Sequence, residues 1–164
     1  MAIFLITIGA FVFGIILIVL LKNTSPPPPQ EQVHFDSLDD KPSYLKDREA
    51  FKEKCLEFLA KFNLEYRHSI WANEHELEID MMDETPVVGG KYLALCIFEP
   101  LNNTVDAIKV MGFLESVKGE GAARGIFITT GYFTSEALRS IEEDPVELVN
   151  IVAFLDYLKK FDIY

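Results

Sequence analysis

The sequence has few of the residues that build metal centres or disulfide frameworks. Its 164 residues contain two cysteines, Cys55 and Cys96, and both lie among apolar neighbours, as buried free thiols usually do. The three histidines, His34, His68 and His75, do not pair at metal-ligand spacing. No CxxC pair or Cys/His cluster is present, which excludes a cysteine-held zinc site and a disulfide-stapled fold. Two core thiols also favour a reducing compartment.

Basic residues are scarce as well. The chain has 15 Lys and Arg against 26 Asp and Glu, a formal charge of −11. Residues 1–30 contain one basic residue, Lys22, and no acidic one, so the remaining 14 basic and 26 acidic residues give −12. Nucleic-acid binding draws most of its affinity from Lys and Arg placed on phosphates. The charge balance therefore disfavours DNA or RNA as the partner.

One long hydrophobic run lies near the N-terminus. Residues 3–21 contain no charged side chain, and about 20 apolar residues in a helix cross a hydrocarbon core of about 30 Å. A cleaved signal peptide is the alternative, but it requires a basic start and a small-residue cleavage site, and neither is present. Residues 1–22 are therefore predicted to form a single-pass transmembrane anchor. Lys22 follows the run directly, which favours a cytoplasmic location for the domain behind it.

A linker follows the hydrophobic run. Four consecutive prolines at positions 26–29 favour an extended polyproline II spacer of about 3.1 Å per residue. The stretch that follows is acidic, with Asp36, Asp39 and Asp40. We expect residues 23–42 to connect the anchor to one folded domain at residues 43–164.

Hydrophobic periodicity predicts alternating helices and strands in this domain. Strands are expected at residues 64–70, 74–82, 91–98, 124–130 and 148–152. Helices are expected at residues 44–62 after a Ser43 cap, from Thr104 to about 118, after a cap at Thr134 or Ser135, and at 154–161. Ala107, Ile108, Met111 and Leu114 form the predicted inner face of the second helix. This order favours an α/β fold around a mixed sheet.

The order of elements and one segment carry a family resemblance. Residues 124–138 read as a hydrophobic strand that ends in Thr-Thr-Gly and continues through Phe-Thr into a helix. With the strands before them, residues 44–161 resemble the Mrr-type restriction endonuclease domain, a metal-dependent DNA-cleaving fold. The resemblance implies a core of a helix, three antiparallel strands, a helix and a strand joined in parallel, here with one N-terminal transmembrane helix added.

The same resemblance identifies the candidate catalytic positions. In that family a metal-binding carboxylate closes the second strand, and Asp80 occupies this place, with Glu78 or Glu76 as a second oxygen ligand. The next strand normally carries Gln or Glu, one further residue, and a catalytic Lys. Leu95 and Ile97 stand at those positions. The other interpretation of Asp80 and its neighbours is a solvated acidic strand face without metal.

Three hypotheses follow. The first is a membrane-anchored, catalytically degenerate domain that binds a protein partner and needs no cofactor. The alternative is an active or weakly active Mg²⁺-dependent DNA endonuclease built on Asp80, on Glu78 or Glu76, and on Glu99 at the exit of the third strand. The third is an accessory module of a membrane complex in which the transmembrane helix carries the specificity. In each of them the chain is held at the membrane by residues 1–22.

Overall fold

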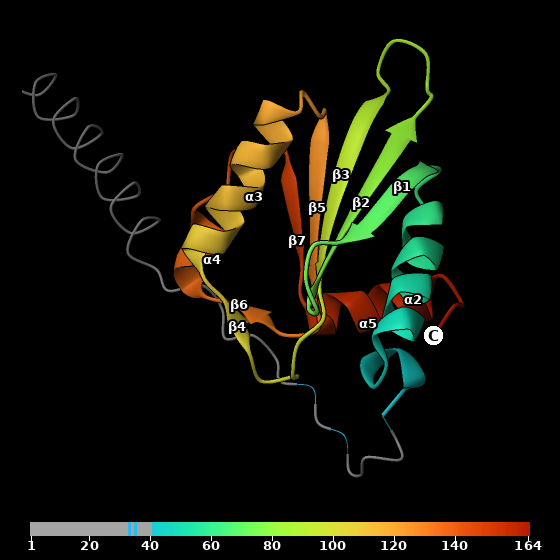
Figure 1. Cartoon of the computed structure of the whole chain (residues 1–164), viewed down its shortest axis with the longest axis vertical. Coiled ribbons are helices and arrows are strands. Elements are labelled where there is room, and N and C mark those ends of the chain that lie inside the picture. The colour runs from blue at the N-terminus through green and yellow to red at the C-terminus, as the bar shows by residue number, and fades with distance from the viewer. Residues whose placement is uncertain (1–32, 34, 36–40) are drawn as a thin grey trace, which may run out of the picture.

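The computed structural model describes residues 33, 35 and 41–164 (Figure 1). The predicted anchor at residues 1–22 and most of the predicted linker lie outside the described residues. Within the described part, no helix is long and apolar enough to span a bilayer. Val33 and Phe35 of the predicted linker pack against the core of the domain, and the Val33 amide donates a hydrogen bond to the Tyr132 hydroxyl at 2.8 Å.

The first helix begins later than the sequence predicted. Ser43 opens only a short 3-10 turn, η1 (Ser43–Leu45), and α2 (Arg48–Ala60) starts after Asp47. The Asp47 carboxylate accepts the Ala50 amide at 2.8 Å, which satisfies a donor that the helix leaves free at its N-terminus. The helix also ends before residue 62, where the prediction placed its end, and Phe62 is 43% exposed. The buried residues of the helix are Phe51, Cys55, Phe58 and Leu59.

A five-stranded mixed sheet runs in the order β1-β2-β3-β5-β7 (Figure 1). Its strands are β1 (Glu65–Trp71), β2 (Glu76–Asp83), β3 (Gly90–Ile97), β5 (Arg124–Thr129) and β7 (Val146–Val149). The first three pair antiparallel, and β3, β5 and β7 pair in parallel. This confirms the mixed α/β architecture with a central sheet. A small parallel pair, β4 (Thr104–Val105) with β6 (Tyr132–Phe133), was not predicted.

Helices cover both faces of the sheet (Figure 1). One apolar core holds α2 and α5 (Ile151–Lys160) against one face, and a second holds α3 (Ala107–Gly119) and α4 (Ser135–Arg139) against the other. The cap at Thr134 is confirmed, since its hydroxyl accepts the Ala137 amide at 3.2 Å. The last strand and helix, expected at 148–152 and 154–161, both begin earlier, at Val146 and Ile151. Asn150 ends the extended segment and caps α5, which is why the helix starts before residue 154.

The predicted inner face of α3 is wrong for Ile108 and Met111 and confirmed for Leu114. Ile108 is 81% exposed and Met111 is 52% exposed. The helix begins after Asp106 and buries Val110, Phe113 and Val117 together with Leu114, which was on the predicted face. Because α3 has apolar residues on more than one side, local periodicity does not select the buried one. The packing of Phe113 against Phe127 of β5, with ring centroids 5.4 Å apart, determines which side of α3 is buried.

The two cysteines lie in the core, as predicted. Cys55 on α2 and Cys96 on β3 are both fully buried. Burial raises the pKa of the Cys55 thiol well above its usual value, and a hydrogen bond with Cys96 acts in the same direction. The Cys55 thiol is therefore neutral, and both side chains belong to the core that packs α2 onto the sheet.

The Thr-Thr-Gly segment ties β5 to the chain that leaves β3. The buried Thr130 hydroxyl accepts the Glu99 amide at 2.8 Å, and the Thr130 amide donates to the Ile97 carbonyl at 3.0 Å. At Gly131 the backbone passes so close to Asn103 that a side-chain carbon would overlap the Asn103 carbonyl oxygen. Only glycine fits this crossing.

We therefore expect Gly131→Ala to lower the free energy of unfolding by about 1–3 kcal/mol, the usual effect of overpacking. Urea unfolding of a chain of residues 31–164 measures the change. Gly112→Ala is the matched control, since, apart from neighbouring residues and the backbone of α3 itself, no described atom lies within 4 Å of the added carbon. That variant should be unchanged or more stable by about 0.5–1 kcal/mol. Equal stability of the two variants would contradict the close approach at Gly131.

Candidate functional site

The register of β2 and β3 brings the predicted site residues onto one face of the sheet. Acidic residues of β2 lie directly opposite apolar residues of β3. The pairs are Glu76 with Ile97, Glu78 with Leu95, and Asp80 with Leu93. The prediction that Asp80 and Leu95 lie on adjacent strands is thus confirmed, although the residue directly opposite Leu95 is Glu78. All six side chains point toward α3, because side chains two residues apart share a sheet face.

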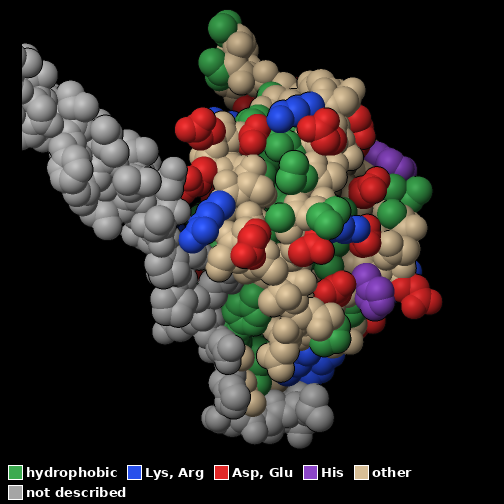
Figure 2. Space-filling model, turned by 90° about the vertical axis from the view of Figure 1, so that its left-hand side faces the viewer, with side chains coloured by type: hydrophobic (Ala, Val, Ile, Leu, Met, Phe, Trp, Pro, Cys, Tyr) green, Lys and Arg blue, Asp and Glu red, His purple; other side chains and the backbone are tan. Residues whose placement is uncertain are grey.

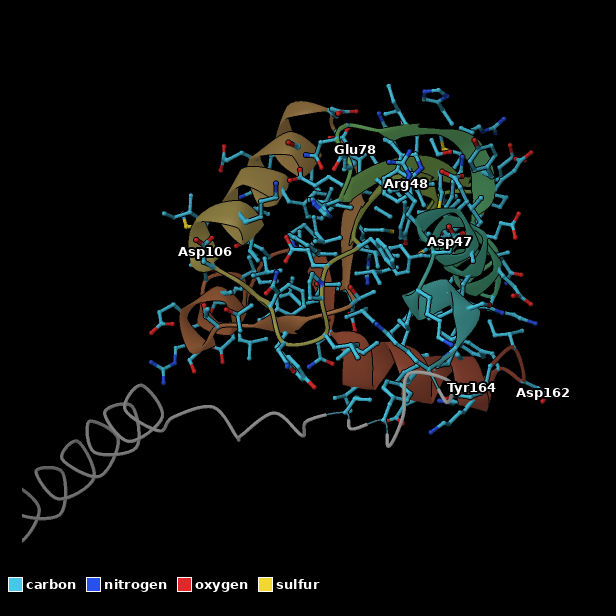
Figure 3. All side chains as sticks on the ribbon, turned by 60° about the horizontal axis from the view of Figure 1, so that its bottom comes forward. Asp47, Arg48, Glu78, Asp106, Asp162 and Tyr164 are labelled. Atoms are coloured by element: carbon cyan, nitrogen blue, oxygen red, sulfur yellow. The ribbon has the colours of Figure 1, made fainter. Side chains whose placement is uncertain are left out.

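A cleft of about 510 Å³ lies between this part of the sheet and α3. Glu78 and Asp80 line its strand side, and Asp106 and Glu120, near the two ends of α3, line its helix side. Figure 3 shows Glu78 and Asp106 on these two different elements. An adjoining hollow of about 210 Å³ is shared by Glu76 and Glu99. The predicted acidic residues are therefore neighbours around one surface.

Three of these carboxylates are held by lysines. Lys109 of α3 reaches Glu76, with Nζ 2.6 Å from Oε1. Lys91, at the start of β3, lies between Glu120 and Asp80, with Nζ 3.3 Å from Oδ2 of Asp80. The hydrogen bond to Glu120 is the main reason that the pKa of Lys91 is raised, and Asp80 adds to the effect. Lys91 therefore stays charged at neutral pH.

Glu76 is also held in its charged form. Burial acts to raise the pKa of its carboxyl group, but hydrogen bonds from Lys109 and Asn73 outweigh burial, so that the pKa lies below its usual value. Glu78 differs from its neighbours. It is exposed, and no lysine or arginine of the described part of the chain forms an ion pair with it.

The residues present do not fit a divalent cation. Magnesium requires several oxygen ligands in a near-octahedral arrangement. Among the described residues, no group of three or more His, Cys, Asp or Glu side chains is placed to hold a metal ion. On β3 the facing side chains are hydrocarbon, and Asp80 and Glu76 already contact lysine ammonium groups. The side chains of Lys91 and Lys109 therefore supply the positive charge beside these two carboxylates.

Leu95 and Ile97 are part of the core between the sheet and α3. They are 6% and 3% exposed and belong to the same buried cluster as Val110 and Phe113. Sequence reasoning found the strand side of this site but missed Lys109, Asp106 and Glu120. No local signal marks these residues, because they reach the site only through the packing of α3.

Comparison with known proteins assigns the fold to a family. The family model Mrr_cat, described as restriction endonuclease, matches residues 49–158. The chain belongs to this restriction endonuclease family. The match extends from the first turn of α2 into the last turns of α5, so it includes the sheet, α3 and the cleft. This confirms the resemblance to the Mrr-type domain.

A solved structure shows the same fold. The MspJI restriction endonuclease, determined in complex with a 27-mer oligonucleotide, matches with a TM-score of 0.53 and 15% identity, over 82% of this chain and 35% of that one. The DNA modification-dependent restriction endonuclease AspBHI matches with a TM-score of 0.48 and 14% identity, over 82% of this chain and 40% of that one. This member of the family is thus similar to less than half of each enzyme. No curated protein matches its sequence.

Proposed function

We propose that this chain is a membrane-anchored restriction endonuclease-like domain that has lost catalysis and acts as a binding or accessory module. The observation that carries the proposal is the pairing across β2 and β3. The carboxylates of β2 face Leu93, Leu95 and Ile97, and lysines hold Glu76 and Asp80. Where the family resemblance implies a polar ligand and a catalytic lysine, this chain has two buried hydrocarbon side chains.

The chemistry of phosphate cleavage supports this proposal. A lysine that stabilises charge at the scissile phosphate typically contributes about a hundredfold or more to the rate. Lys91 shares this face of β3, but Asp80 and Glu120 hold its ammonium group. The formal charge of −12 on residues 31–164, from 14 basic and 26 acidic residues, also opposes binding to DNA phosphates. The binding role requires no cofactor.

The proposed setting is the cytoplasmic side of a membrane. The hydrophobic run at residues 3–21 supplies the anchor, and the four prolines at 26–29 supply a spacer. A protein is the proposed partner, because the acidic domain is unsuited to nucleic acid. The same binding role also fits an accessory module of a larger membrane complex. In that case the anchor helix carries the specificity for the complex.

The nuclease alternative is supported by the family itself and by the hollow that Glu76 shares with Glu99. Plasmid DNA incubated with the purified protein and Mg²⁺ or Mn²⁺ distinguishes the two functions. We expect no cleavage and no tight DNA binding at moderate salt. Cleavage that is abolished by Asp80→Ala but retained by Glu53→Ala, a change on the opposite side of the sheet, would establish the nuclease and refute the proposal.

A further inference from the structure

The cleft beside α3 has a strong excess of negative charge. Six carboxylates surround it and the adjoining hollow. They are Glu76, Glu78 and Asp80 of β2, Glu99 after β3, and Asp106 and Glu120 at the two ends of α3. Among the described residues, two lysines pair with members of this set, Lys91 and Lys109. The surface therefore favours a cation, and a narrow cleft concentrates that field.

The same cleft has an apolar part. Leu93, Leu95 and Phe113 form its base, and Ile108 stands at its rim with 81% of its surface exposed. Met111, on the next turn of α3, is 52% exposed. Figure 2 shows the face that carries α3, where acidic side chains lie around exposed hydrophobic ones. A single exposed isoleucine is ordinary, but here it borders a cleft that a side chain can enter.

We infer that this cleft binds a basic amphipathic segment of a partner protein. An aliphatic side chain of that segment packs against Ile108 and the base of the cleft, and its lysines or arginines pair with Glu78 and neighbouring carboxylates. This inference rests on the proposed binding function and identifies the chemistry of the partner. Nucleic acid is unsuited to the site because its phosphates have the same sign of charge as the rim.

The chain itself does not supply such a segment in its predicted linker. Residues 23–42 contain one basic residue, Lys41, against four acidic residues: Glu31, Asp36, Asp39 and Asp40. Like charges at close range repel each other. Charge complementarity therefore points to a different polypeptide as the occupant.

The test measures binding of a designed peptide to the purified full chain in a nonionic detergent. The probe is a fluorescein-labelled peptide of about 14 residues, with leucines at helical spacing and lysines elsewhere. Fluorescence anisotropy at about 0.1 M salt gives its affinity, and more salt should weaken the complex. A second peptide with serine in place of leucine should bind at least about tenfold more weakly, because it buries no aliphatic side chain.

Matched variants locate the site. Glu78→Lys should weaken binding by about tenfold, whereas Glu53→Lys, the same charge change on α2 across the sheet, should weaken it by less than about threefold. Ile108→Ser should weaken it by about tenfold, and Val88→Ser, at a 75% exposed position in the turn before β3, should have no effect. All four positions are on the surface, so the variants should keep the wild-type circular dichroism.

The outcomes separate this inference from the function on which it rests. Absence of peptide binding, or binding that Glu78→Lys and Ile108→Ser leave unchanged, would overturn the inference about the cleft. If the chain also leaves plasmid DNA intact, the binding-module proposal stands with a different site. If the chain instead cleaves DNA through Asp80, the proposed function fails whatever the peptide does.

Discussion

Deletion of residues 1–30 should release the protein from the membrane. The removed segment contains the uncharged run at 3–21, and an apolar helix of this length is stable in a bilayer and insoluble in water. What remains has a formal charge of −12, from 14 basic and 26 acidic residues, which favours solubility. Ultracentrifugation after expression should find the full chain in the membrane pellet, also after an alkaline wash, and the shortened chain in the supernatant. We expect the full chain to be entirely in the pellet and the shortened chain to be entirely in the supernatant.

Deletion of residues 23–30 alone is the matched control, since it removes the prolines but keeps the hydrophobic run. That variant should stay in the pellet. A full chain that is found in the supernatant would refute the anchor. A mature N-terminus near residue 22, found by sequencing the purified protein, would show instead that residues 1–22 act as a cleaved signal.

Phe127→Ala should give the largest loss of stability of the substitutions proposed for this domain, about 3–5 kcal/mol. Phe127 lies at the centre of the core between the sheet and α3 and has no exposed surface. Its ring meets those of Phe113 and Phe133 edge to face, with centroids 5.4 Å away in both cases. Removal of the ring loses its burial, both aromatic contacts and the packing around the cavity that is left.

Urea unfolding of residues 31–164 measures this loss. Ile108→Ala is the control on α3, since its side chain is 81% exposed, and its stability should stay within about 0.5 kcal/mol of the wild type. If Phe127→Ala lowers the free energy of unfolding by less than about 1 kcal/mol, the packing of α3 on the sheet does not depend on the Phe127 ring. Because α3 forms one wall of the cleft, Phe127→Ala should also weaken binding of the basic peptide.

Sequence reasoning succeeded where the signal is local. The strands at 91–98 and 124–130 have apolar residues on both faces at their centres, as expected for strands covered on both faces, and the structure has them within one residue at each end. The cap at Thr134 depends on a hydroxyl and an amide three residues apart. The start of α2 shows the limit of such signals. Ser43 and Asp47 both suit an N-cap, and only the second one caps the helix.

The sequence by itself determined the order of elements, the buried strands, the family and the shortage of basic charge. Each of these depends on neighbouring residues or on composition. Tertiary structure alone decided that α3 exposes Ile108, that Lys109 reaches Glu76 and that Lys91 lies between Asp80 and Glu120. These lysine contacts join residues 11 to 33 positions apart along the chain. Their geometry follows from strand register and from the packing of Phe113 on Phe127, and local periodicity encodes neither.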